Sequence, residues 1–189
     1  MKQPLSADLP FAEGYVLPID KPLGWTSSDV VRKIKVMMRR LGHRKIKVGH
    51  AGTLDPLATG ILIVCLGRAT KQAEALQAQP KEYLTTLALG ATTPSFDMEH
   101  PVDRTFPYEH ITRQMLEEAL RTMEGEQMQL PPVYSAKSID GKRAYEYARQ
   151  GTEVEMRRAP VTVYGMRLES FEPPRATLRI RCSKGTYIR

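Results

Sequence analysis

The sequence predicts an α+β fold with a mixed, largely antiparallel sheet and flanking helices. Residues 26–41 and 111–125 carry apolar side chains at the spacing of amphipathic helices. Residues 83–90, 161–171 and 176–183 have the apolar and polar pattern of strands. The mixed order of these segments favours a sheet whose strands pair antiparallel in large part.

The N-terminal half begins with a predicted strand and helix. Tyr15–Pro22 predicts a short strand that ends at its final proline, because proline cannot extend a hydrogen-bonded ladder. Thr26 or Ser27 can cap the helix that follows, and Gly42 can end it. Residues 43–60 have no helical or strand period and are rich in Gly, Thr and Pro. They predict a long ordered loop, which in compact domains is usually functional.

Further along, Ile61–Gly67 predicts a buried strand or the start of a helix, and residues 69–79 predict a helix. Residues 128–147 follow no regular pattern. Cys65 and Cys182 each lie in an apolar run, so we expect buried, structural thiols. Neither cysteine belongs to a Cys/His cluster, and no metal site is expected.

Composition favours a protein that binds a polyanion. The 189 residues suffice for one domain with a sizeable core. No apolar run approaches the roughly 20 residues needed to cross a bilayer, so we expect a cytoplasmic protein that binds no membrane. The formal net charge is +7. Eight basic residues and no acidic one lie between Asp29 and Asp55, a one-sided block that favours an anionic partner over a merely solvated surface.

The densest signal is the segment GHAGTLDPLATG, residues 49–60. Its three glycines permit tight turns and the close approach of a ligand. Pro56 stiffens the loop and biases Asp55 away from helical geometry. The segment therefore predicts a carboxylate held on a rigid loop.

This loop resembles the signature of the bacterial TruB family of pseudouridine synthases, which make pseudouridine 55 in the T-loop of tRNA. Further segments resemble motifs of that family in the same order: residues 20–27, residues 81–83, residues 130–137 with 141–151, and residues 182–189. The resemblance runs from about Tyr15 to the last residue. It implies the pseudouridine synthase catalytic fold, with an RNA-binding insertion at about 128–151.

The resemblance also implies roles for individual residues. Asp55 matches the essential aspartate, Tyr83 the tyrosine that packs on the target base, and Arg189 the arginine that pairs with the aspartate. His50 matches a residue that contacts the flipped-out RNA. Lys21 belongs to a motif that supports the loop from behind, and we expect its role to be structural. We expect the substrate to be bound by His50, Lys21, Gly52, Thr53, Leu54 and Tyr187, and by Arg39 and Arg40 of the basic block.

The chemistry of the implied reaction fits these groups. Isomerising uridine breaks the N1–C1′ bond and joins C5 to C1′, and no atom enters or leaves. No cofactor or metal is therefore expected. A carboxylate can add to C1′ or take the proton from C2′, and the sequence leaves both routes open. The target base must first leave its stack, which costs a few kcal/mol.

We expect an isomerase, an intramolecular transferase, that works as a monomer on the T-arm of tRNA without a guide RNA. One alternative is the archaeal and eukaryotic relative that acts in a guide-RNA particle. Leu57–Thr59 and the insertion favour the stand-alone form. A second alternative is an RNA-binding module or tRNA chaperone without catalysis. The presence together of Asp55, Tyr83 and Arg189 argues against it.

The expected organisation is a mobile N-terminal arm at residues 1–13 and a catalytic domain at 14–189. Arg189, the last residue, falls inside the final motif. Members of the family continue beyond it, often with a C-terminal RNA-binding domain that is absent here. We therefore expect an incomplete domain that is less stable and less active than a longer form.

Overall fold

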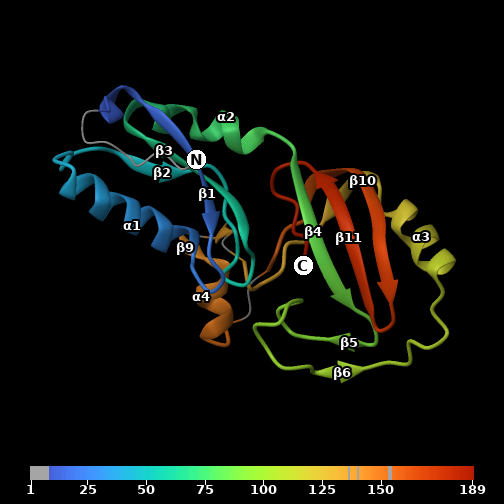
Figure 1. The fold of residues 1–189 in the computed structure, drawn as a ribbon. Helices are drawn as coiled ribbons and strands as arrows, with labels where there is room; N and C mark the ends of the chain where they lie inside the picture. The colour runs from blue at the N-terminus through green and yellow to red at the C-terminus, as the bar shows by residue number, and fades with distance from the viewer. Residues whose placement is uncertain (1–8, 136, 140, 153–154) are drawn as a thin grey trace. The chain divides into compact units, whose positions relative to one another are not determined.

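The computed structural model describes residues 9–135, 137–139, 141–152 and 155–189. The chain divides into two compact units, residues 1–78 and 79–189. Each unit is built on an antiparallel sheet of its own, as the ribbon shows (Figure 1).

The first unit contains a three-stranded sheet in the order β1-β3-β2. Its strands are β1 (Tyr15–Lys21), β2 (Val48–His50) and β3 (Gly60–Leu66), and they pair antiparallel. Helix α1 (Ser27–Arg40) packs on this sheet. The buried side chains between helix and sheet include Val30, Ile34, Met38, Leu62, Val64 and Leu66.

A capping box starts α1. The Thr26 hydroxyl accepts a hydrogen bond from the Asp29 N–H, and the Asp29 carboxylate accepts one from the Thr26 N–H, each at 3.0 Å. These two bonds satisfy backbone donors that the first turn of a helix leaves unpaired. Of the two residues that could cap the helix, Thr26 is the cap and Ser27 is the first helical residue.

The first unit also contains two short 3₁₀ helices, η1 (Phe11–Glu13) and η2 (Gly67–Gln72). Helix α2 (Ala73–Ala78) directly follows η2. Phe11 is fully buried. Of the predicted N-terminal arm, residues 1–8 lie outside the described residues, and the rest leads through η1 into β1.

The second unit contains a four-stranded antiparallel sheet in the order β4-β11-β10-β7. Its strands are β4 (Lys81–Ala88), β7 (Gly125–Gln129), β10 (Ala159–Glu172) and β11 (Arg175–Cys182). Helix α3 (Arg113–Thr122) lies beside β10 (Figure 1) and packs Leu116 and Leu120 into the core. The other buried residues of this core are Val163, Leu168, Ala176, Leu178, Ile180 and Cys182.

Smaller elements complete the second unit. Strands β5 (Ala91–Thr92) and β6 (Arg104–Thr105) pair with each other. Strands β8 (Ser138–Ile139) and β9 (Lys142–Arg143) form another pair, followed by α4 (Ala144–Arg149). These last three elements fall in the segment predicted to be an RNA-binding insertion.

The predicted α+β class, the main strands and the two amphipathic helices are confirmed, and all pairings among the described strands are antiparallel. Residues 43–60 were predicted to form one long loop, which is wrong for Val48–His50, because these residues form strand β2. Residues 69–79 are helical as predicted, but the first part is the 3₁₀ helix η2. Cys65 and Cys182 are free and buried, as predicted. In the described part of the chain, no helix is both long and apolar enough to cross a membrane.

Candidate active site

The loop between β2 and β3 presents the half-buried Asp55. Leu54, the residue before it, packs against the core of the first unit. After Asp55 the chain turns sharply, since the Ala58 N–H donates to the Asp55 carbonyl at 3.0 Å. The aspartate therefore stands between an apolar anchor and a hydrogen-bonded turn.

Ser27 binds the backbone just before the aspartate. The Ser27 hydroxyl accepts a hydrogen bond from the Leu54 N–H at 3.0 Å and is placed to donate to the Leu54 carbonyl at 3.2 Å. Ser27 is the first residue of α1 and is only 3% exposed. One buried side chain thus ties the loop to the start of the helix.

Lys21 binds the backbone just after the aspartate. Its side chain is fully buried, and its Nζ donates to the carbonyl oxygens of Pro22 (3.0 Å), Trp25 (2.6 Å) and Pro56 (3.3 Å). The Gly24 N–H donates to the same Pro56 carbonyl at 2.8 Å. These contacts support the loop from the end of β1.

The pKa of the Lys21 amine is shifted from its ordinary value, which the neighbouring residues in the sequence do not predict. Burial lowers the pKa of Lys21, and the negative charge of Asp55 opposes that shift. Three carbonyl acceptors surround the ammonium, which is how a buried charge is tolerated. The contacts of Lys21 favour a supporting role for this residue.

The first part of the loop is shaped by His50 and Gly52. The Nδ1 atom of His50 hydrogen-bonds the Gly52 carbonyl. Because a carbonyl oxygen only accepts hydrogen bonds, the Nδ1 atom of His50 must be the donor in this contact. Gly52 has a φ of 115°, which a side chain would strain, and Thr53 is exposed.

Tyr83 belongs to the second unit. It lies on β4 opposite Ile180 of β11, and its half-buried side chain packs against the core of that unit. It points to the same side of β4 as Lys81, Thr85 and Leu87, which alternate with four exposed residues. The sheet thus fixes the position of the ring.

The segment that follows β11 is hydrogen-bonded along its length. The Gln129 amide donates to the Tyr187 carbonyl and accepts from the Tyr187 N–H, both at 2.9 Å. Ser183 bonds Thr162 in both directions, at 2.8 and 2.9 Å. These hydrogen bonds fix the segment between the end of β11 and Arg189 to β10 and β7.

Arg189 forms an ion pair with Asp97 inside the second unit. Its Nη1 lies 2.7 Å from the Asp97 Oδ2, and its Nη2 donates to the Tyr134 carbonyl. The two side chains are 11% and 18% exposed, so the pair is largely shielded from water. The guanidinium is held by a carboxylate and a backbone carbonyl at once.

Asp97 was missed by the sequence reasoning. Burial acts to raise the pKa of Asp97, but the nearby Ser95 side chain, a hydrogen bond from the Glu99 N–H and the guanidinium of Arg189 hold it below its ordinary value. Asp97 is thus an ionised partner that orients Arg189. A lone aspartate in an irregular segment carries no sequence signal of a partner 92 positions away.

The predicted residues are divided between the two units. The Asp55 loop, Lys21 and His50 lie in the first unit, and Tyr83, Tyr187 and Arg189 in the second. The ion pair between Asp55 and Arg189 stays a prediction. Arg39 and Arg40 lie exposed in the last turn of α1. No cluster of three His, Cys, Asp or Glu side chains suited to a metal occurs among the described residues.

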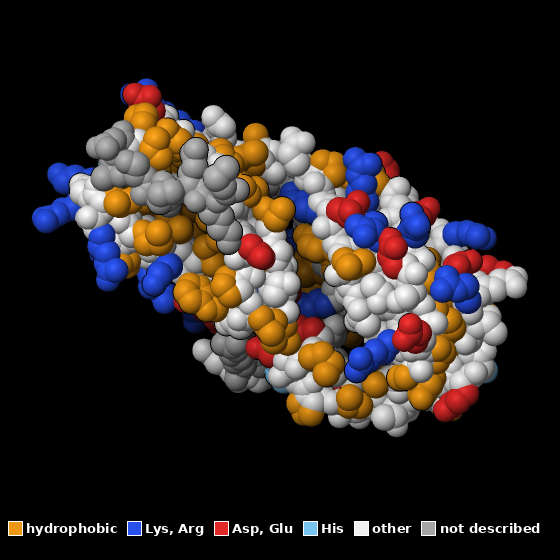
Figure 2. Space-filling view, viewed as in Figure 1, with side chains coloured by type: hydrophobic (Ala, Val, Ile, Leu, Met, Phe, Trp, Pro, Cys, Tyr) orange, Lys and Arg blue, Asp and Glu red, His pale blue; other side chains and the backbone are white. Residues whose placement is uncertain are grey.

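Charge is distributed differently on the two units. Lys and Arg side chains project from the first unit around α1 (Figure 2). On the sheet of the second unit, Arg179 pairs with Glu82 at 2.8 Å and Glu169 at 2.7 Å. The charge of Arg179 is therefore neutralised locally on that sheet, whereas α1 carries acidic charge only at Asp29.

Solved structures with a similar fold include chains of protein and RNA–protein complexes. A chain in the crystal structure of a Cbf5–Nop10–Gar1 complex matches with a TM-score of 0.69 and 27% identity, over 98% of this chain and 44% of that one. A chain in an H/ACA RNP bound to a substrate RNA containing 2′-deoxyuridine matches with a TM-score of 0.62 and 26% identity, over 92% of this chain and 39% of that one.

Sequence relatives show higher identity. The tRNA pseudouridine synthase B of Phocaeicola vulgatus is 55% identical over 180 residues, which are 95% of this chain and 77% of that protein. The enzyme of the same name from Flavobacterium johnsoniae is 46% identical over 181 residues, 95% of this chain and 79% of that protein. The family described as TruB family pseudouridylate synthase (N terminal domain) matches residues 39–188. As its motifs predicted, the chain belongs to the TruB family of pseudouridylate synthases, which are isomerases.

Proposed function

We propose that the chain converts the uridine at position 55, in the T-loop of tRNA, to pseudouridine, with Asp55 as its catalytic carboxylate. Pseudouridine formation is the activity of the family, and tRNA is the substrate named for the relatives. One observation carries the assignment to Asp55: buried side chains bind the residues on both sides of it. Ser27 holds Leu54, and Lys21 holds Pro56.

The reaction is a balanced rearrangement. The N1–C1′ bond of the uridine breaks, the uracil turns, and C5 bonds to C1′. The proton on C5 then leaves, and N1 gains a proton. Asp55 can act by adding to C1′ and leaving again, or by removing the C2′ proton and returning it. Both routes need an ionised carboxylate close to the ribose.

The fixed backbone explains how Asp55 can serve this reaction. A carboxylate whose flanking residues are already bound needs little reorganisation when substrate arrives. Tyr83 would supply the aromatic face on which the released base turns, and its hydroxyl would receive the C5 proton. Arg189, oriented by Asp97, would keep Asp55 ionised by its positive charge.

The substrate is held through its shape and its phosphates. The exposed basic residues of α1, including Arg39 and Arg40, contact the backbone of the T-arm. His50 contacts the flipped-out nucleotide beside the loop. The enzyme acts as a monomer in the cytoplasm, without a guide RNA.

The test is release of tritium from a tRNA transcript labelled at C5 of uridine, with purified protein and no guide RNA. We expect stoichiometric release from one uridine, and pseudouridine at position 55 in the product. Asp55→Asn should release less than about a thousandth as fast, because an essential catalytic group is lost while its shape is kept. Its affinity for tRNA should stay within a few-fold of wild type.

Three outcomes contradict the proposal. Tight tRNA binding without tritium release would identify an RNA-binding module or chaperone. Release that occurs only with an added guide RNA would identify the particle-dependent enzyme. Undiminished turnover by Asp55→Asn would remove Asp55 from the chemistry.

A further inference from the structure

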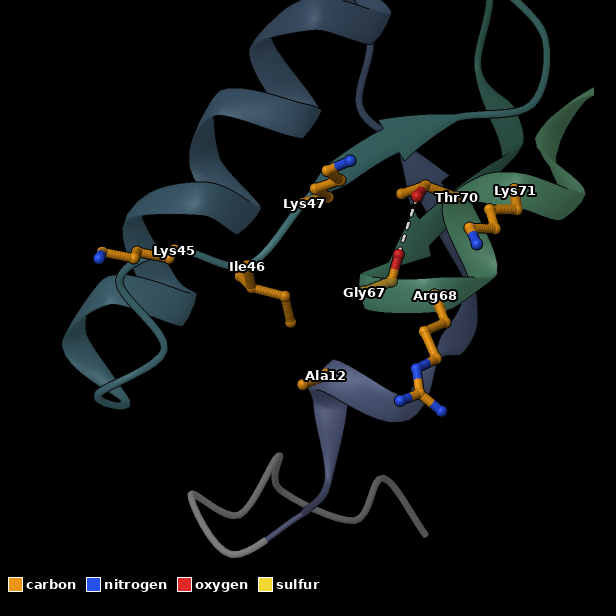
Figure 3. Close-up of a pocket in the computed structure, with 8 residues that line it drawn as sticks. All are labelled: Ala12, Lys45, Ile46, Lys47, Gly67, Arg68, Thr70 and Lys71. Atoms are coloured by element: carbon orange, nitrogen blue, oxygen red, sulfur yellow. Dashed lines mark hydrogen bonds between the residues drawn. The ribbon is translucent and has the colours of Figure 1, made fainter.

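Polar side chains also gather away from the Asp55 loop. On the first unit, a pocket of about 290 Å³ beside η2 has Lys45, Lys47, Arg68 and Lys71 in its lining (Figure 3). Like the exposed residues of α1, these cations belong to the basic surface of the first unit, whose role in holding the substrate is proposed above. A different cluster surrounds Arg189 in the second unit, where an aromatic pair lies behind the carbonyl group that Arg189 binds.

Arg189 is held from two sides. Its Nη1 lies 2.7 Å from the Oδ2 of Asp97, and its Nη2 donates to the Tyr134 carbonyl. The Tyr134 ring packs on the imidazole of His100, with ring centroids 4.7 Å apart and ring planes inclined at 49°. That separation lies in the range of favourable aromatic pairs. The carbonyl that binds Arg189 therefore belongs to a residue whose own ring is packed against a neighbour.

Asp97 and His100 belong to one loop, residues 93–100, which follows β5 (Figure 1). We call it the Asp97 loop. The Thr93 hydroxyl donates to the Asp97 carbonyl at 2.7 Å, and the Glu99 N–H donates to the Asp97 Oδ1 at 3.0 Å. These bonds fix the backbone on both sides of the carboxylate. One hydrogen-bonded loop therefore contributes to both supports of the guanidinium.

Packing against Tyr134 is the contact that the structure shows for the His100 ring. The Nδ1 atom of His100 is buried and, within the described part of the chain, has no hydrogen-bond partner. The backbone around Tyr134 is enclosed as well, since Pro132 and Ser135 are buried. The imidazole thus contributes through its shape and its ring face, and a phenyl ring would keep that packing.

We propose that His100 is a positioning residue for Arg189 and acts through Tyr134. The packed His100 ring holds Tyr134 so that its carbonyl meets Nη2 while Asp97 meets Nη1. A guanidinium bound at both nitrogens has a fixed plane, because its donors form a rigid fork. The inference rests on the proposed function, in which Arg189 keeps Asp55 ionised. It adds to that function a residue that acts without touching the substrate.

The direct test follows the Arg189 guanidinium by nitrogen NMR in protein labelled at arginine. Slow rotation about the Nε–Cζ bond gives separate Nη1 and Nη2 signals, and Arg189→Lys identifies those of Arg189 by their loss. We expect separate signals in wild type and in His100→Phe, which keeps a ring against Tyr134. His100→Ala removes the ring and should merge the signals. The inference is overturned if the wild-type signals are merged, or if the two His100 variants behave alike.

Turnover gives a second test. His100→Ala should lower kcat for tritium release roughly tenfold and leave KM within about twofold, because a loosened Arg189 affects the reacting step rather than binding. His100→Phe should restore the wild-type kcat. In an Arg189→Lys background, measured in single turnovers, His100→Ala should cost less than about twofold more, since lysine lacks the fork that joins both supports. A further tenfold loss in that background would show that His100 acts independently of Arg189.

Stability and a matched control separate positioning from a merely structural role. His110→Ala removes an exposed imidazole of the same unit and should keep the wild-type Arg189 signals and kcat. His100→Phe should melt no lower than wild type, because it removes a buried nitrogen that lacks a partner among the described residues. If the activity of His100→Ala falls only in proportion to the fraction unfolded at the assay temperature, the inference is overturned.

The two readouts also separate this inference from the proposed function. The NMR signals need no substrate, so they judge how Arg189 is held apart from any turnover. Conversion of the target uridine by wild-type protein judges the proposed function. Arg189 signals that respond to His100 as expected, in a protein that converts no uridine, would support the positioning and contradict the proposed function.

Discussion

The Nζ of Lys21 donates a hydrogen bond to the carbonyl oxygen of Pro56, 3.3 Å away and 35 positions later in the chain. Lys21 ends β1, and Pro56 directly follows Asp55. The bond therefore connects the sheet to the loop that carries the candidate catalytic group. Lys21 is buried and has two further carbonyl acceptors, so the bond is part of the core of the first unit.

Lys21→Met should damage catalysis more than folding. The substitution keeps the buried methylene chain and removes three charge-assisted bonds, so the free energy of unfolding should fall by about 1–3 kcal/mol. A loosened Asp55 should lower kcat roughly hundredfold, because small misplacements of a reacting group are costly. Tritium release and urea unfolding measure the two effects.

Lys35→Met is the matched control for Lys21→Met, since Lys35 is exposed on α1. It should unfold at the wild-type urea concentration. If Lys21→Met keeps the wild-type kcat while losing stability, Lys21 supports the fold but does not position Asp55.

Tyr83→Phe separates two roles of one residue. The ring would remain packed on the second core, so folding and RNA binding should be unchanged. Loss of the hydroxyl should slow tritium release by about 10²–10⁴-fold if Tyr83 takes the C5 proton. Near-wild-type release by Tyr83→Phe, with loss of activity in Tyr83→Leu, would show that the ring acts only as a platform for the base.

The exposed face of α1 should bind phosphates. Lys33, Arg39 and Arg40 are all exposed on this helix. Replacing them with Ala should weaken tRNA binding and flatten its salt dependence by roughly 0.7–0.9 in log–log slope for each phosphate that the protein no longer neutralises. Binding titrations across a salt series check this. An unchanged slope would show that this face does not touch RNA.

Local signals in the sequence were sufficient to predict α1 and the long strands. Thr26 is a residue type that caps helices, and the apolar positions of the helix repeat at helical spacing. Strand β2 escaped prediction because three residues, one of them Gly49, are too few to show alternation. It forms because β3 offers it hydrogen-bonding partners, which is a tertiary effect.

The candidate site was only partly predictable for the same reason. Asp55 stands out through its own neighbours in the loop. The contacts that hold this loop cannot be recognised from neighbouring residues, because Ser27 and Leu54 are 27 positions apart in the sequence. Asp97 carries no local signal, since its importance comes from Arg189, which is distant in the sequence. Single-sequence reasoning finds groups with a distinctive local setting and misses those defined by a distant partner.

Asp97→Asn should release Arg189 and alter the pH dependence of stability. The pKa of Asp97 is lowered in the folded state, so its stabilising contribution is present well above its ordinary value of 3.8. That contribution is lost as the pH falls through the lower folded-state pKa. At neutral pH the variant should lose about 1–3 kcal/mol of unfolding free energy, because Arg189 loses a charged partner.

Urea unfolding at a series of pH values tests this expectation. The difference between wild type and Asp97→Asn should be constant near neutrality and shrink as acid protonates the wild-type carboxyl. Asp103→Asn, which changes an exposed aspartate of the same unit, should follow wild type at every pH. Turnover of Asp97→Asn should also fall, since an unsupported guanidinium no longer keeps a fixed position. A stability difference that persists unchanged in strong acid would mean that the charge of Asp97 is not what holds Arg189.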